Sequence, residues 1–287
     1  SWYRRQRQMC IRDRYRYPDV TYKDDISFKC GDLTFNLHHA RGETDDHTWI
    51  HIPEEKLIAP GDLFIWAVPN GGNPQKVQRY ISDWADALDE MLKLECEIFL
   101  PGHGFPILGK KRIEKALETT SKFLRSIEDQ TLKLMNQGKS LNQVLHEVEI
   151  PNDLMELPWL TPIYDDPQFL IRMIWRRYGG WWDGEYDRLF PAPRKEEALA
   201  WVELSNGIDN IILKALENLN KGNLKVAAQL IETAFHADND NDQMHDARAK
   251  IYREFSLKQS SSMGRNILNH ASMASAQGKR DLAQTED

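Results

Sequence analysis

Three side chains with the chemistry of metal ligands follow strand-like runs in the first half of the chain. Glu43 and Asp62 each come after such a run and a glycine, and His103 lies in the glycine-flanked segment PGHG. Carboxylate oxygen and imidazole nitrogen are common ligands of zinc and other divalent transition metals. Each signal is weak alone, because a lone loop histidine is more often structural. At successive strand ends of one sheet, the three together predict a shared metal site.

Polar neighbours of Glu43 could support such a site. His47 lies four residues later and could orient Glu43 or Asp45, although a hairpin histidine bonded to backbone is the equal alternative. The guanidinium of Arg41 matches a tetrahedral oxyanion in fork geometry, so it could bind a substrate anion. A surface salt bridge from Arg41 to Asp45 or Asp46 is the competing interpretation.

The loop NGGNP offers a second group of anion donors. Asn70 and Asn73 could donate amide N–H groups to an anion, and Lys76 or Arg79 could add positive charge. The same loop predicts a helix start, with Asn73 as the N-cap and Pro74 at the first helical position.

Periodic patterns indicate the elements that must hold these side chains. The first part of the chain reads mainly as strands, and the chain after it reads as helix. We expect two strands over 26–40, a second strand pair over 47–69 around the turn PEEK, a helix from Pro74 that carries Val77 to Met91, a short buried strand at 96–104, and an amphipathic helix over 110–136.

A Pro-rich connector, residues 150–167, separates this α/β-like half from an all-helical half. A chain of 287 residues is long enough for two domains of ordinary size. We therefore expect an α/β part over 15–150 and a helical part over 151–287. Short helix–turn–helix units fill the second part, without a full repeat pattern.

Residues 1–14 fit neither part. They carry several arginines and the segment RQMCIRDR, which resembles translated read-through of a sequencing adapter. We expect a non-native scar of sequence assembly, with a basic arm as the alternative. On that expectation the native chain begins near Tyr15 and lacks upstream residues, and the compartment in which it works stays open.

The bulk composition excludes two classes of partner. A formal net charge of −7 and a pI of about 5.8 argue against nucleic acid. No apolar run approaches the roughly 18 residues that cross a bilayer. Hydrophobic residues make up 41% of the chain, which is enough for a core in each half.

The segment GETDDHTWIHIPEEKLIAPGDLF resembles the second half of a metallo-β-lactamase fold, and FLPGHG resembles that superfamily's late histidine loop. The resemblance implies the C-terminal portion of an αββα sandwich, with two zinc ions in each intact site. It implies Asp62 as the ligand that bridges the ions and His103 as a ligand of the second. Glu43 stands where many members of the superfamily have histidine. The alkylsulfatase branch instead has a glutamate in this region, and that glutamate binds the first ion.

The helical half resembles the alkylsulfatase dimerisation domain. Residues 171–207 carry the resemblance, most specifically in the segment YGGWWDG, and residues 222–252 resemble that domain's next helices. This resemblance implies a homodimer and a hydrolase of small sulfate esters such as alkyl sulfates. The family's sulfate-binding pattern is not reproduced in residues 67–80, so the helical half carries the inference about substrate.

The motif His-x-His-x-Asp-His, which supplies further ligands to both ions in that superfamily, is absent from the sequence. His38 and His39 cannot replace it, because adjacent side chains on a strand point to opposite faces. The sequence therefore predicts half of a two-metal site, with unknown catalytic residues, in a chain that is itself inactive. The alternatives are a hydrolase of another ester or anion on the same scaffold and a non-enzymatic helical dimerisation module.

Trp175, Tyr178, Trp181 and Trp182 form a dense aromatic cluster in the helical half. Such rings could line an apolar channel for an alkyl chain, because each buries a large area. Core packing or dimer contact is the commoner use. An apolar, aromatic face left uncovered would favour a homodimer interface.

Overall fold

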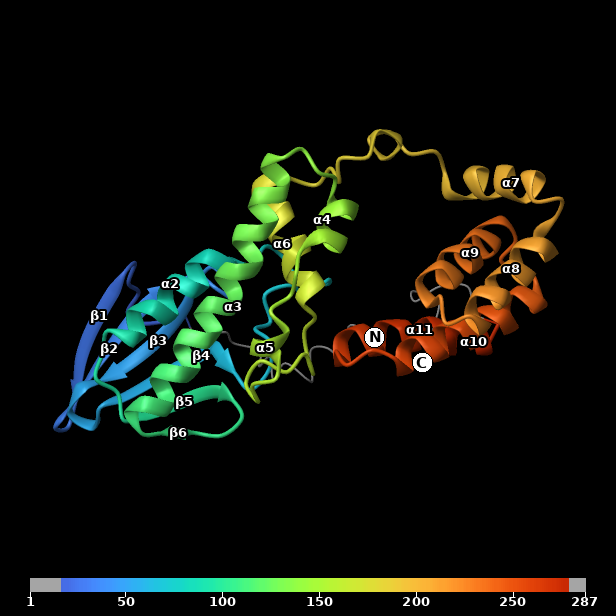
Figure 1. Cartoon of the computed structure of the whole chain (residues 1–287). Helices are drawn as coiled ribbons and strands as arrows, with labels where there is room; N and C mark the ends of the chain where they lie inside the picture. The colour runs from blue at the N-terminus through green and yellow to red at the C-terminus, as the bar shows by residue number, and fades with distance from the viewer. Residues whose placement is uncertain (1–16, 279–287) are drawn as a thin grey trace.

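The computed structural model describes residues 17–278, so the stretch 1–14 that we expect to be a scar lies outside it. Within that range, a six-stranded sheet occupies the first part of the chain (Figure 1). Its strands lie side by side in chain order: β1 (Asp25–Cys30), β2 (Leu33–Ala40), β3 (His47–Ile52), β4 (Leu57–Ile65), β5 (Ile98–His103) and β6 (Ile107–Leu108).

The pairing of β4 with β5 sets the edge at which the polar residues meet. Strands β1 to β4 pair antiparallel, and the 3-10 helix η1 (Pro53–Glu55) makes the turn before β4. Strands β4 and β5 instead run parallel, with a crossover through helix α2 (Ile81–Leu92) between them. Parallel strands bring their C-terminal ends to the same edge of a sheet. Here Ile65 lies opposite His103 at that edge.

Helices α2 and α3 (Lys110–Asn136) pack against each other and against the sheet (Figure 1). Helix α3 has the bounds that its amphipathic pattern predicts, because its buried positions recur at helical spacing. Trp84 of α2 is completely buried and donates its Nε1–H to the carbonyl of Leu63, at 2.6 Å. These contacts build the first hydrophobic core.

Three shorter helices join the same core: α4 (Leu141–Glu147), α5 (Asn152–Met155) and α6 (Pro167–Gly179). A capping box on Ser140 starts α4, and the carboxylate of Asp166 accepts the N–H of Gln168 at the start of α6. The first core extends as far as Trp175. It therefore crosses residue 150, and the division of the chain there stays a prediction.

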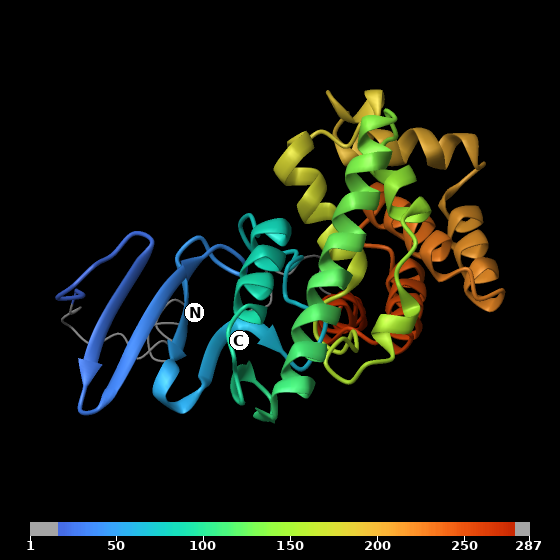
Figure 2. The ribbon, with the colours of Figure 1, turned by 60° about the vertical axis from the view of Figure 1, so that its left-hand side comes forward.

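The remaining helices form a second group with its own core. They are α7 (Arg194–Leu204), α8 (Ile208–Asn220), α9 (Leu224–Ala237), α10 (Asp242–Leu257) and α11 (Ser262–Ala276), and the 3-10 helix η2 (Tyr186–Arg188) precedes them. Figure 2 shows this group beyond α4 and α6, on the side away from the sheet. Aliphatic residues of α8, α9 and α10 fill its core, with Ile231 and Ile251 completely buried.

One predicted helix boundary is wrong. Helix α2 begins at Ile81, not at Pro74, and Asn73 is not its cap. The side chain of Asn73 instead accepts the N–H of Gln75 in a local turn. Gly72 packs so tightly on Phe169 that a Cβ there would lie 2.2 Å from its backbone carbon, which fixes the loop before the helix can start.

None of the helices in residues 17–278 is long and apolar enough to cross a bilayer.

Candidate active site

Asp62 and His103 come together at the edge where β4 and β5 end. The β4–β5 register shifts on both sides of Gly61, which has φ +56°. The Nε2 atom of His103 lies 3.5 Å from Oδ1 of Asp62. Gly102 makes the approach possible, because a Cβ at that position would lie 2.3 Å from the Asp62 Oδ1 atom.

Glu43 reaches the same place from the loop between β2 and β3. Gly42 packs this loop onto the core, since a Cβ there would lie 2.4 Å from a methyl group of Leu63. The Glu43 carboxylate lies near enough to Asp62 to raise the pKa of Asp62. The structure thus brings together the three predicted ligands, Glu43, Asp62 and His103, which line one pocket.

A buried arginine holds the second carboxylate of this group. The Nη1 atom of Arg79 lies 2.6 Å from Oε1 of Glu43 and donates to the backbone carbonyl of Asn70 at the same distance. The Asn70 amide donates to the same Glu43 oxygen at 2.7 Å. Arg79 and Asn70 are both nearly inaccessible to solvent. Two donors therefore fix one oxygen of Glu43 and leave the other available to the pocket.

The pocket itself has a volume of about 480 Å³ and two kinds of wall. Its lining combines the polar group with the apolar or aromatic side chains of Ile65, Trp66, Ile163 and Tyr164. The Trp66 ring is fixed by its Nε1–H, which donates to the carbonyl of Phe105 at 2.8 Å. A lining with both polar and apolar side chains suits a ligand with a charged head and an apolar tail.

Ile163 and Tyr164 come from the Pro-rich connector, and the start of α11 holds them in place. The N–H of Ser262 donates to the carbonyl of Ile163, and the hydroxyl of Ser261 donates to that of Tyr164 at 2.7 Å. Ser261 also caps α11 through the N–H of Gly264. The pocket wall is thus tied to the second group of helices.

The pKa of Asp62 depends on its burial and on the charged side chains close to it. Burial raises the pKa of Asp62 above its usual value, and the nearby Glu43 carboxylate raises it further. His103 and His47 oppose the shift through their positive charge. Close carboxylates of this kind are stabilised by a cation placed between them.

Three other predicted site residues do not line this pocket in the described part of the chain. His47 bonds to backbone, with Nε2 2.8 Å from the carbonyl of Pro60, and its ring packs on Gly61. The guanidinium of Arg41 lies over the Tyr80 ring, 5.3 Å from its centroid. Asn73 forms the local turn described above. Their roles in orienting ligands or binding substrate stay predictions.

Sequence reasoning missed the role of Arg79 and the pocket wall from the connector. Arg79 was predicted as an optional source of positive charge for an anion, but its guanidinium is used on Glu43. Ile163 and Tyr164 lie about a hundred residues from Asp62 and carry no signal of their own. Bonds from α11 on one side, and from Val68 and Gly72 of the first part on the other, hold the connector beside the pocket.

The residues fit a divalent cation in type and in part of the geometry. Two carboxylates and one imidazole line a single pocket, and the Glu43 carboxylate is near enough to raise the pKa of Asp62. Within residues 17–278, however, no group of three or more His, Cys, Asp or Glu side chains is arranged as a ligand set for one ion. The described residues therefore do not form a complete ligand set for an ion, and metal binding by these three side chains stays a prediction.

Comparison with solved structures identifies the class of fold. A stereoselective inverting sec-alkylsulfatase, Pisa1 from Pseudomonas sp., matches 91% of this chain with a TM-score of 0.86, at 22% identity. The match covers 42% of that protein. The sheet with its helices and the following helical group therefore have the fold of this alkylsulfatase, and the predicted α/β plus all-helical fold class is confirmed.

Sequence comparison leads to the family. Residues 140–278 match the family described as alkyl sulfatase dimerisation. A linear primary-alkylsulfatase of Pseudomonas sp. is 26% identical over 239 residues, which is 82% of this chain and 45% of that protein. An alkyl/aryl-sulfatase of Saccharomyces cerevisiae, BDS1, is 26% identical over 201 residues, 69% of this chain and 31% of the relative.

The chain is homologous to alkylsulfatases, and its residues 140–278 form an alkyl sulfatase dimerisation domain. The resemblance predicted from the sequence is confirmed. The chain spans less than half the length of these relatives. The family domain also begins at α4, within the first hydrophobic core, so sequence family and packing divide the molecule at different places.

Proposed function

We propose that this chain is part of a two-zinc hydrolase that cleaves sulfate esters such as alkyl sulfates with metal-activated water. Homology to alkylsulfatases supports the reaction class. The observation that carries the proposal for this chain is the meeting of Glu43, Asp62 and His103 at one pocket. Two carboxylates and an imidazole are the ligand types that zinc takes in hydrolases, which is why their meeting supports the proposal.

In this proposal the two ions would be held by Asp62, Glu43 and His103, with Asp62 as the ligand common to both. When bound, the ions would acidify a water molecule and stabilise negative charge on the leaving oxygen. The remaining ligands would come from residues outside the described range. Neither the ions nor those ligands are needed for the roles of the residues below.

The chain's own residues have separate tasks. Arg79 and Asn70 hold one oxygen of Glu43, which restricts the orientation of this pocket-lining carboxylate. Trp66, Ile163 and Tyr164 form the apolar wall against which an alkyl chain would lie. Asn70 lines the pocket and is the predicted anion donor that the proposal retains.

The same proposal includes a homodimer and a small-molecule substrate, without nucleic acid. The dimerisation family that matches residues 140–278 supports the homodimer. A non-enzymatic dimerisation module is the second candidate. It is favoured by the absence of a complete ligand set within residues 17–278.

Zinc binding by the chain tests the assignment of the ligands. We expect weak binding, measured by competition with a chromophoric chelator. Asp62→Ala and His103→Ala should each weaken it by at least the about 10- to 100-fold that loss of a supporting residue costs at metal sites. His146→Ala is the matched control, because that exposed ring bonds to the backbone of its own helix. Equal zinc affinity in all four proteins would favour the non-enzymatic module.

Substrate class is tested by adding the missing part. The chain should be joined to the preceding portion of the primary alkylsulfatase that it matches, and assayed on dodecyl sulfate, dodecyl phosphate and a dodecyl carboxylate ester. We expect hydrolysis of the sulfate ester by the joined protein and none by the 287-residue chain alone. Hydrolysis of the phosphate ester alone would indicate a different anion on the same scaffold. Activity of the chain alone would contradict the half-site.

A further inference from the structure

A second pocket near the first core, with a volume of about 350 Å³, lies between α6 and the loop of residues 72–76. Three of the residues that line it are positively charged: Lys76, Arg172 and Arg176. In the described part of the chain, none of their side chains forms an ion pair or a hydrogen bond. A chain with a net charge of −7 therefore gathers unpaired positive charge at one place.

The two arginines of this pocket lie one turn apart on α6, where like charges repel each other and weaken a helix. Loss of solvent around the Arg172 guanidinium, and then the charge of Arg188, lower the pKa of Arg172. The carboxylate of Asp183 opposes this shift, but it already bonds to Arg188 at 3.0 Å. The charge at this pocket is therefore left for an anion to balance.

Asn73 offers a neutral donor to the same pocket. Its residue is 8% exposed, and its Oδ1 accepts the N–H of Gln75, which leaves the amide nitrogen to donate elsewhere. Within residues 17–278 this nitrogen has no acceptor, although donors in nearly buried side chains usually have one. Asn73 and Lys76 are two of the predicted anion donors that do not line the pocket of Asp62. Both line this one.

The pocket is held in shape from both sides. Gly72 packs on Phe169, and its N–H donates to the buried carboxylate of Asp165 at 2.8 Å. At the other end of the loop, the amide of Gln78 donates to the carbonyl of Met173 at 3.0 Å. The loop and α6 are thus bonded to each other in the absence of a ligand, so little order has to be gained when one binds.

Apolar side chains complete the lining. Met173 is 5% exposed, Phe169 is partly buried, and Pro74 lies at the edge of the loop. Inorganic anions need no such surface. A lining that combines cations with apolar side chains suits a small organic anion, whose charged oxygens and apolar body are bound by different residues.

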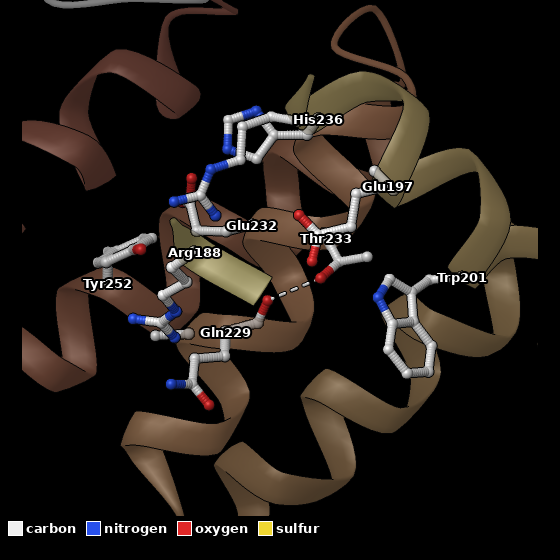
Figure 3. Close-up of a pocket in the computed structure, with 11 residues that line it drawn as sticks. Arg188, Glu197, Trp201, Gln229, Glu232, Thr233, His236 and Tyr252 are labelled. Carbon is white, nitrogen blue, oxygen red and sulfur yellow. Dashed lines mark hydrogen bonds between the residues drawn. The ribbon is translucent and has the colours of Figure 1, made fainter. Parts of the chain in front are cut away.

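The pocket between α7, α9 and α10, about 430 Å³ in volume, provides a contrast (Figure 3). Charges of both signs line it, and they are largely paired. Glu232 accepts from Arg248 at 2.6 Å, and Arg188 donates to Asp183 at 3.0 Å. The unbalanced positive charge thus distinguishes the pocket at α6 from this one.

We propose that the pocket between α6 and the loop of residues 72–76 binds a small organic anion. The anionic oxygens would lie at the three cations and the Asn73 amide, and the apolar body against Phe169 and Met173. Guanidinium groups bind sulfonate, sulfate, phosphate and carboxylate oxygens in fork geometry. This inference stands apart from the proposed zinc site, because it uses none of the three predicted metal ligands.

Hexanesulfonate is a suitable probe, because it has a sulfur oxyanion, a short apolar chain and no ester bond to cleave. Calorimetric titration of the full chain should give a dissociation constant in the millimolar range. Labelling the methionine methyl groups with ¹³C shows where the probe binds. The NMR signal of Met173, assigned with Met173→Leu, should shift on titration. The signal of Met91, which is completely buried in the first core, should not shift.

Charge-removing variants test the assignment to the cations. Arg172→Gln and Arg176→Gln should each weaken binding of hexanesulfonate by at least about 10-fold, the effect of losing one hydrogen bond between charged groups. Arg112→Gln is the matched control, because Arg112 is an exposed arginine at the start of α3 and does not line the pocket. It should leave the dissociation constant unchanged. Circular dichroism checks that each variant is folded.

Four results would overturn the inference: no binding by the wild-type chain, equal binding by the two pocket variants and the control, a Met173 signal that stays fixed while calorimetry records binding, or equal affinity for inorganic sulfate. The last would show that the apolar side chains contribute nothing to an organic ligand. Hexanol, which has the chain without the charge, should bind more weakly than hexanesulfonate. Loss of zinc binding in the ligand variants described above bears on the zinc site alone, so the two proposals can fail separately.

Discussion

The sheet-bearing part and residues 181–204, here called the arm, expose opposite kinds of groups. Around the sheet, large apolar side chains such as Trp84 are completely buried, and polar side chains such as Asp62 line the pocket. In the arm, the rings of Tyr186 and Phe190 are largely exposed. The first part thus presents polar groups at its surface, whereas the arm presents apolar rings. Substitution of a large ring should therefore affect stability differently in the two parts.

The largest contrast is expected between two tryptophans. Trp84→Ala removes a completely buried ring that donates to Leu63, so it should lower the free energy of unfolding by about 3–5 kcal/mol. Trp201→Ala removes a half-exposed ring from the arm and should lower it by less than about 1 kcal/mol. Denaturant unfolding at low protein concentration measures both. If both variants lost the same free energy of unfolding, the buried Trp84 and the half-exposed Trp201 would contribute equally to stability, which contradicts the comparison.

Asp165 of the connector binds the loop that follows β4 and should make stability depend on pH. Its carboxylate is completely buried and accepts the N–H groups of Gly72 and Asp166, both at 2.8 Å. Burial raises its pKa to about 7, against the effect of those two donors. Below about pH 4 both the folded and the unfolded chain hold the proton. Between about pH 4 and 7 only the unfolded chain releases it, so stability falls as pH rises through that window.

The variant Asp165→Asn isolates this effect, because its side chain stays neutral. The stability of the variant relative to wild type should rise by about 3–4 kcal/mol between pH 4 and pH 8, from a pKa difference of about three units. Chemical unfolding at a series of pH values gives this difference directly. A constant difference across the series would show that the carboxyl group of Asp165 does not titrate in this range.

A smaller effect is expected for the arginine that holds Glu43. Arg79→Met removes a buried guanidinium and leaves the carboxylate without its charged partner, which should cost about 2–3 kcal/mol because Glu43 keeps some contact with solvent. Adding Glu43→Gln should recover part of the loss, since a neutral amide needs no counter-charge. The double-mutant cycle in unfolding free energy measures this coupling. Independent, additive losses would mean that the pair does not act together.

Local sequence patterns predicted most of the helices and strands. They did not predict the contacts between segments that are far apart in the sequence. Helix α3 has the predicted bounds because its buried positions repeat over 27 residues. The start of α2 was missed, because Asn73 and Pro74 are good helix starters that the packing of Gly72 on Phe169 overrides. The packing of α6 into the first core also depends on contacts between residues far apart in sequence, which no window of the sequence contains.

The candidate site divides in the same way. The meeting of Asp62 and His103 followed from residue type and from the expectation that neighbouring strands end together. The partner of Glu43 did not, because Arg79 reaches back across 36 residues and its sequence position suggests an anion contact equally well. Its burial, which only the fold reveals, decides between the two uses.

The grip of α11 on the connector has a consequence for how such proteins can diverge. The start of this last helix bonds to Ile163 and Tyr164, so one wall of the pocket is set by residues almost a hundred positions downstream. A genetic crossover between these segments would combine a pocket from one parent with a support shaped for another. Functional hybrids should therefore take the connector and α11 from the same parent. The part that contains the pocket and the part that contains α11 could not be exchanged independently.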